Sequence, residues 1–135
     1  ADMATATQFD VGELLRGIII SDAKMASKVG LRVYPGELPD TTSYKPNSSD
    51  LPAIHYSLIS DLESDEAPIS RSSWQFTVVT NTQEELQSTW GALKELLNRY
   101  KNDRIRYVEY VNSSYEWDTE TKTPYSPMTF RVTFY

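Results

Sequence analysis

The chain has 135 residues, a formal net charge of −6 at pH 7, no cysteine and a single histidine. This length suits one domain, because a single hydrophobic core typically serves about 50 to 200 residues. A chain without cysteine has no disulfide, no thiolate nucleophile and no Cys-type zinc or iron–sulfur site. The hydrophobic fraction of 39% and the aromatic fraction of 12% indicate a folded globular domain, since disordered chains are poor in aromatic residues.

Nothing in the sequence indicates a membrane or secretory segment. The longest apolar run, residues 17–20, is far shorter than the ~20 residues that span a bilayer. No basic segment followed by an apolar one opens the chain, so we expect no secretory signal and no membrane partner. The compartment that we expect is the cytoplasm, or the larger structure into which the protein is assembled.

Charge is distributed unevenly along the chain. Residues 1–70 hold 11 acidic and five basic side chains, whereas residues 71–135 hold eight of each, so the entire net charge lies in the first half. The densest acidic stretch is 61–66, and the densest basic stretch is 99–106. Binding to a nucleic-acid backbone requires a net basic face, so the overall balance argues against it, and we interpret the basic run as a solvated helix end.

The first predicted elements are two helices. Residues 1–8 are small and polar with no period, and we expect a flexible tail there, followed by a single domain over 9–135. Asp10 and Glu13 have the spacing of a capping box, and apolar residues at helical spacing follow them. Asp22 is a second candidate cap, which predicts a short additional helix.

A long helix is predicted over 82–97, because Thr82 and Glu85 form a second capping box and leucines follow at three- and four-residue steps. Gly91 lies in the middle of this helix, where glycine costs about 1 kcal/mol relative to alanine, and we expect a close approach to another backbone there. Apolar side chains alternate along the predicted strands. These strands cover residues 31–34, 54–59, 74–80, 105–111, 115–117 and 128–135.

The connections include three polar segments, 37–50, 60–72 and 118–127, which we predict to be loops. The first of these has about fourteen residues, and loops of that length within a compact domain are usually functional or mobile. Helices and strands in this order, without repeated βα units, predict an α+β fold. We expect a two-layer domain with a mainly antiparallel sheet of four to five strands and helices packed on one face.

The sequence offers little that catalysis could use. His55 is the only histidine and lies in mid-strand, and any serine or threonine nucleophile would need it or a lysine. None of the common hydrolase, zinc-protease or phosphate-loop motifs occurs. The acidic residues of 63–66 lack the glycine and the spacing of a calcium loop, and Asp118 and Glu120 lie in a threonine-rich turn. We therefore predict no enzyme activity, no catalytic residue, no cofactor and no metal site.

Four segments in a fixed order carry a resemblance to a known family. Residues 30–39 contain the pattern R-x-Y-P-G, and residues 51–56 read L-P-x-I-x-Y. Residues 74–80 then lead into the predicted long helix, and 130–134 form the end of the closing strand. Together with the opening helix, these segments resemble the tail-completion, or tail-terminator, proteins of long-tailed bacteriophages over residues 9–135.

The resemblance implies a structural role in virus assembly. Proteins of that family form a six-fold ring that caps the tail tube, stops its polymerisation and offers a surface to the neck on the head side. DNA passes through such a ring without being read. The ring lies at the proximal end of the tail in the virion, which is assembled in the cytoplasm of the bacterial host. The implied partners are other copies of this chain, the tail-tube protein and the head-side neck or connector protein.

The polar loops supply the residues that we expect at ring or tube contacts or in the channel, since loops on a packed scaffold commonly carry recognition. An acidic channel would avoid holding DNA, and we expect some carboxylates of 61–66 or other acids to line it. The candidate interface or channel residues are Glu37, Asp40, Tyr44, Lys45, Asp61, Glu63, Asp65, Glu66, Asp118, Glu120 and Lys122.

Two alternatives stay open at this point. The loop at 37–50 is longer and more polar than the family pattern, and the stretch at 112–127 is less compact, which leaves room for a sister role as a neck or head-closure component. A small α+β ligand-binding domain or enzyme is the alternative of another class, and a deep pocket that gathers His55 with carboxylates would favour it.

Overall fold

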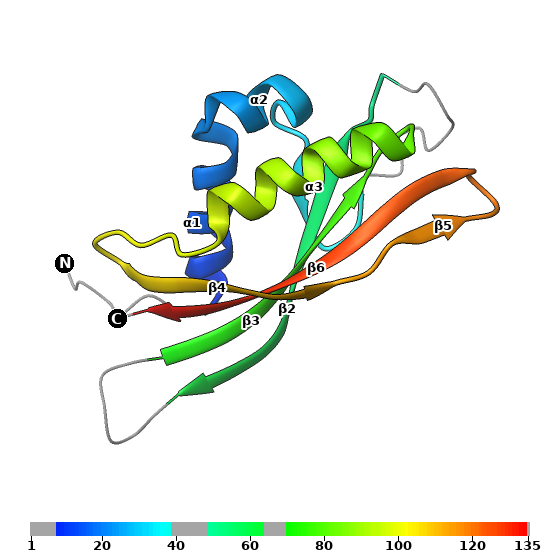
Figure 1. The fold of residues 1–135 in the computed structure, drawn as a ribbon. Helices are drawn as coiled ribbons and strands as arrows, with labels where there is room; N and C mark the ends of the chain where they lie inside the picture. Colours follow the sequence, from blue (N-terminus) through cyan, green and yellow to red (C-terminus); the bar gives the residue numbers. More distant parts are fainter. Residues whose placement is uncertain (1–7, 39–48, 64–69, 135) are drawn as a thin grey trace.

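A mainly antiparallel sheet with helices on one face organises the part of the chain that the structure describes (Figure 1). This computed structural model describes residues 8–38, 49–63 and 70–134. The helices are α1 (Gln8–Ser21), α2 (Ala23–Val29) and α3 (Gln83–Leu97). The strands are β1 (Val33–Pro35), β2 (Ala53–Glu63), β3 (Ser70–Val79), β4 (Ile105–Ser113), β5 (Glu116–Asp118) and β6 (Thr123–Phe134).

The strand order across the sheet is β1-β2-β3-β6-β4, and β5 pairs with the first residues of β6. β1 is parallel to β2, and the other pairs are antiparallel. The predicted α+β fold, with a mainly antiparallel sheet and helices packed on one face, is confirmed. Within the described ranges the sheet has six strands instead of four to five, because the short β1 and β5 both pair into it.

Alternating side chains of the strands build the core beneath the helices. Ile54, Phe76 and Phe130 are fully buried on the helix-facing side of β2, β3 and β6. Phe76 stacks on Tyr56 with ring centroids 5.3 Å apart and meets Phe130 edge-on at 6.1 Å. Two helices contribute further buried side chains at helical spacing. These are Val11, Leu15 and Ile19 of α1 and Leu86, Leu93 and Leu97 of α3.

Side-chain caps start α2 and α3 where the sequence predicts them. Asp22 Oδ2 accepts the backbone N–H of Met25 at 3.0 Å, and Thr82 Oγ1 accepts that of Glu85 at 3.1 Å. The Glu85 carboxylate accepts the backbone N–H of Asn81 at 3.1 Å, one residue before the cap. The predicted caps at Asp22 and Thr82 are confirmed, and the reciprocal bond of the Thr82 capping box is shifted by one position.

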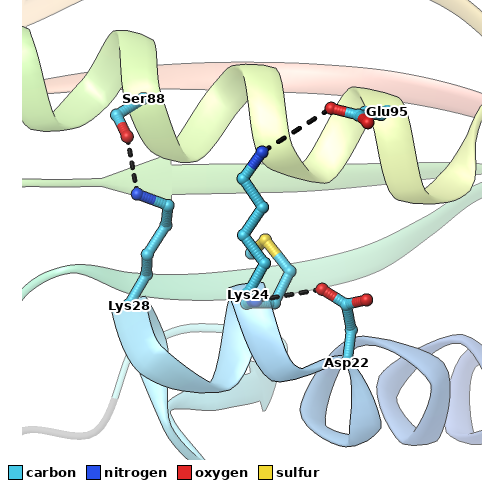
Figure 2. A network of polar contacts seen from close by, with 6 residues as sticks. Asp22, Lys24, Lys28, Ser88 and Glu95 are labelled. Atoms are coloured by element: carbon cyan, nitrogen blue, oxygen red, sulfur yellow. Dashed lines mark hydrogen bonds and ion pairs between the residues drawn. The ribbon is translucent and has the colours of Figure 1, made fainter.

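Polar contacts join α2 to α3 across the surface of the helical layer (Figure 2). Lys28 Nζ donates to Ser88 Oγ at 2.5 Å, and Lys24 Nζ lies 3.7 Å from Glu95 Oε2. The side chains of Lys24 and Glu95 are 62% and 79% exposed, so this ion pair contributes little to stability. The burial of apolar side chains such as Met25 is therefore what mainly holds α2 in place.

Several boundaries differ from the sequence prediction. α1 begins at Gln8, so Asp10 lies within the helix instead of before it, while the other residues of the predicted tail lie outside the described residues. β2 and β3 extend into the predicted loop 60–72, and β6 begins inside the predicted loop 118–127. A backbone ladder pairs polar residues as well as apolar ones, so polarity alone did not mark the strand ends.

The two motifs that carry the family resemblance lie against each other. Val33–Pro35 of the first motif pairs in parallel with residues 54–56 of the second. Arg32 Nε donates to the carbonyl of Pro52 at 3.0 Å, and Arg32 Nη2 donates to that of Lys28 at 3.1 Å. The arginine of R-x-Y-P-G thus ties the end of α2 to the start of β2, which is a structural role.

Candidate functional site

The sheet face opposite the helices is mostly polar, and we call it the open face. Its side chains alternate with the buried ones along each strand, so the pairing register identifies them. At one end, Leu38 and Leu51 pack with Ala53 and Val79 in a small second cluster that covers part of this face. Further members of this face are His55, Ser57 and Ser60 of β2, Arg71, Ser73, Gln75 and Thr77 of β3, Pro127, Thr129, Arg131 and Thr133 of β6, and Tyr107, Glu109 and Asn112 of β4.

A depression of about 270 Å³ on the open face contains His55 and one carboxylate, Asp118. Burial lowers the pKa of His55, and a backbone hydrogen bond with Gly36 and the charge of Glu37 oppose this effect only in part. His55 is therefore mainly neutral at pH 7. The structure thus brings the predicted residues Glu37 and Asp118 to the same part of the open face, around His55.

Asp118 has a structural role in the turn between β5 and β6. Its Oδ1 accepts the backbone N–H groups of Glu120 at 2.9 Å and Thr121 at 3.2 Å, as aspartate does in tight turns. Lys122 completes the turn with a φ of 57°. Because Asp118 is held by its own turn, the depression is a poor match for a histidine–carboxylate pair that activates a nucleophile.

The residues that the structure describes contain neither a cluster of metal ligands nor a helix that could span a membrane. None of their His, Cys, Asp or Glu side chains form a group of three or more that could hold a metal ion. No helix among them has both the length and the apolar character needed to cross a bilayer.

The other end of the open face carries two arginines. Arg71 and Arg131 line a second depression, of about 310 Å³, together with serine residues. Arg131 Nη1 lies 3.3 Å from Glu109 Oε1, and both side chains are about half exposed. The depression is basic and open to solvent, and the Glu109 carboxylate already neutralises one of its two guanidinium groups.

The predicted interface residues are divided between separate parts of the sheet. Glu37, Glu120 and Lys122 are exposed, and the last two lie in the β5–β6 turn. Asp61 and Glu63 belong to β2 at the opposite end, paired with Ser72 and Ser70, and their side chains lie outside the described residues. Also outside them are Asp40, Tyr44, Lys45, Asp65 and Glu66. Whether any of these residues contacts a partner or lines a channel stays a prediction.

Sequence reasoning missed the large apolar side chains that are exposed near the sheet edges. Tyr115, next to β5, and Trp117 in β5 are 49% and 52% exposed. Tyr107 and Val111 of β4 are 42% and 38% exposed, and Ile59 of β2 is 50% exposed. Alternation predicts a strand but not its place in the sheet, so no local signal separates these residues from core residues.

Comparison with known proteins identifies the fold. No protein-family model matches the sequence, and no curated protein matches it. Among solved structures, a chain from the virion of a native gene transfer agent particle has the same fold, with a TM-score of 0.70. The two chains are 14% identical, and the match covers 97% of this chain and 98% of that chain.

Proposed function

We propose that this chain is a structural component of a phage-like virion and that it acts there as a tail terminator. The observation that carries the proposal is the fold shared with a chain of the gene transfer agent virion. That match extends over nearly the full length of both chains, so the whole domain is similar and not only one common motif. The virion role is the broader part of the proposal, and the terminator role is the narrower part.

The sequence motifs support the narrower part. The R-x-Y-P-G and L-P-x-I-x-Y segments, which resemble tail terminators, form adjacent strands of one sheet. Arg32 of the first segment bonds to the carbonyl of Pro52 in the second. The residues that resemble the family therefore lie in one structural unit. If the two short patterns matched the family only by chance, nothing would require them to lie side by side.

The proposed mechanism is the completion of a ring at the end of the tail tube. Copies of this chain, six in the family pattern, close through heterologous contacts and match the tube on one face only. The other face cannot accept tube subunits, so polymerisation ends there, and it joins the head-side neck or connector protein. DNA passes through the channel, where the carboxylates of the acidic first half would repel its backbone.

The geometry of the open face favours assembly over catalysis. Asp118, the carboxylate in the depression beside His55, is held by the N–H groups of its own turn, so it is not available to orient His55 as a general base. A protein that acts through its surfaces needs no activated nucleophile, metal or cofactor. We accordingly include in the proposal that this chain is not an enzyme and uses no cofactor.

Elongation of purified tail-tube protein tests the terminator role. We expect tubes to stop growing at a length that falls as the ratio of this chain to tube protein rises, because each completed ring removes one growing end. An unrelated acidic protein of similar size is the control and should leave tube length unchanged. Tubes that grow without limit contradict the terminator role, and binding at tube ends without arrest would instead indicate a neck component.

A further inference from the structure

We propose that the exposed side chain of Leu31 inserts into an apolar pocket beside Trp90 of a second copy of this chain. The inference rests on the ring proposed above and names one contact between its successive subunits. Residues 28–32, which carry Leu31, are called the anchor turn. The depression lined by Leu86, Trp90 and Tyr115 is called the aromatic pocket.

Leu31 is the most exposed of the large apolar side chains in the part of the chain that the structure describes, and hydrogen bonds fix the turn that carries it. Its side chain is 69% exposed. The Leu31 carbonyl accepts the backbone N–H of Val33 at 2.8 Å and Nη2 of Arg16 at 3.3 Å. Arg16 Nε also donates to the carbonyl of Val33 at 2.7 Å. The turn is therefore ordered before a partner binds, which lowers the entropy cost of inserting the side chain.

The aromatic pocket has the volume and the lining for one aliphatic side chain. It measures about 240 Å³, and Leu86, Trp90 and Tyr115 form its apolar wall. An apolar cavity of about 150 Å³ accommodates benzene, so a leucine side chain, which has fewer carbon atoms, fits this pocket. The indole of Trp90 is held in place, because its Nε1 donates to Ser113 Oγ at 3.0 Å and its ring meets Tyr110 edge-on at 6.1 Å. The pocket is therefore formed before a partner binds.

The anchor turn and the aromatic pocket flank α3 from opposite sides. Ser88 of α3 contacts α2, which leads into the anchor turn, whereas Trp90 lines the pocket. These two residues are two positions apart, so they lie on different faces of the helix. Figure 1 shows α2 and β5 on opposite sides of α3. Leu31 therefore lies across α3 from the pocket of its own chain, and only a second copy can bring the two together. Such a contact between unlike patches is heterologous, and it closes a ring when the rotation between copies closes.

Positive charge surrounds the anchor turn. Residues 22–32 hold three basic side chains and one acidic side chain, and Arg16 contacts the turn. Lys28 donates to a serine hydroxyl, and Arg16 and Arg32 donate to backbone carbonyls. The acceptors of these hydrogen bonds carry no formal charge, so the bonds leave the positive charge of the three side chains uncompensated.

The surroundings of the aromatic pocket are acidic. Residues 81–87 and 113–122, which supply most of its lining, hold five acidic side chains and one basic side chain. Lys94, whose Nζ lies 5.1 Å from the centre of the Trp90 ring, adds a second basic group and leaves the acids in excess. Two anchor turns or two pockets facing each other would place like charges together, whereas an anchor turn against a pocket joins opposite charges. Charge therefore favours the anchor turn of a second copy as the occupant of the pocket.

The absence of cysteine from the sequence allows a direct cross-linking test. Leu31→Cys on the anchor turn and Ser114→Cys in the lining of the pocket are prepared separately and mixed. The mixture is treated with a short bis-maleimide at increasing protein concentration, with and without tail-tube protein. We expect a cross-linked dimer in the mixture, little in either variant alone, and a ladder of multimers in the double variant. The matched control is Ile59→Cys, at another exposed apolar position, mixed with S114C.

Each outcome of the cross-linking supports or contradicts the proposed insertion. Strong self-linking of L31C alone, or linking of I59C to S114C as efficient as that of L31C, contradicts it. The absence of any dimer above the I59C control, both with and without tail-tube protein, contradicts it as well. Gln87→Cys, at an exposed position of the same pocket, replaces S114C and repeats the test if that variant does not fold.

Arrest of tube growth separates this inference from the proposed function. Leu31→Ala is expected to raise the amount of protein needed for arrest at least about tenfold, because even one methylene lost from an apolar pocket weakens binding about tenfold or more. Ile59→Ala is the control and should arrest tubes as the unmodified chain does. Arrest by L31A equal to that by the unmodified chain would overturn the inference and leave the proposed function standing. Cross-links between L31C and S114C without arrest by the unmodified chain would do the opposite.

Charge reversal provides an independent readout of the same contact. Lys24→Glu with Lys28→Glu on the L31C chain, or Glu84→Lys with Glu116→Lys on the S114C chain, is expected to lower the yield of dimer about fivefold, since attraction between exposed charges is replaced by repulsion. Combining the reversed anchor side with the reversed pocket side should restore the yield. Equal yields in all four combinations would contradict the assigned charge complementarity.

Discussion

Replacing Phe76 with alanine is expected to lower the free energy of unfolding by about 3–5 kcal/mol, the range for a large aromatic side chain removed from a core. Phe76 is fully buried, and its ring contacts Tyr56 of β2 and Phe130 of β6. The substitution therefore leaves a cavity at the centre of the sheet, between three neighbouring strands. Because folded domains have only about 5–15 kcal/mol of stability, this loss is a large fraction of the total.

Urea unfolding followed by circular dichroism measures the effect of the Phe76 substitution. Ser57→Ala, on an exposed position of the neighbouring strand, is the control and should change stability by less than about 0.5 kcal/mol. A loss below 1 kcal/mol for F76A would mean that the ring is not central to the core. Strand β3 would then have to be held between β2 and β6 by other contacts.

Replacing Gly12 with alanine is the second large effect that we expect, a net destabilisation of about 1–3 kcal/mol. A Cβ at Gly12 would lie 2.6 Å from Cη2 and 2.8 Å from Cζ3 of Trp74. Trp74 is buried, and its Nε1 donates to Ser72 Oγ at 2.8 Å, so the ring cannot easily move away. The gain in helix propensity, about 1 kcal/mol, is too small to offset an overlap of this size.

Gly91→Ala is the matched comparison, because the same substitution is made in a helix where space is open. A Cβ at Gly91 meets no atom within 4 Å. We expect G91A to raise the free energy of unfolding by about 1 kcal/mol through helix propensity. Thermal and urea unfolding of both variants measure the two effects. If G12A were as stable as G91A, the close packing of α1 on Trp74 would be refuted.

Gly12 and Gly91 show what local sequence signals cannot predict. The prediction placed a close approach at Gly91, but the structure places it at Gly12, against a tryptophan that is 62 positions away in the sequence. Helix propensity identifies a glycine that lowers helix stability. It does not identify the packed side chain from a distant part of the sequence that leaves no room for a Cβ at that position. The caps at Asp22 and Thr82, by contrast, depend on residues within three positions, and both were predicted correctly.

The fold class was predictable because alternation and helical spacing are local features of the sequence. The strand ends were not predictable, because backbone pairing does not depend on whether the paired residues are polar or apolar. The pairs Asp61–Ser72 and Glu63–Ser70 continue β2 and β3 through a stretch that reads as a loop. The candidate surfaces depend even more on distant residues. That Glu63 and Ile105 share a row follows only from three successive strand pairings. The sequence could therefore indicate the charges of 61–66 and 99–106 but not that they lie at opposite edges of one sheet.

Cryo-electron microscopy of the virion tests the central claim, that this chain is a virion component at the end of the tail, most directly. We expect a ring of density at the proximal end of the tail tube, between tube and neck, into which copies of the described fold fit. Density for this chain at another place in the particle, or a particle that contains no copy of it, would contradict this assignment.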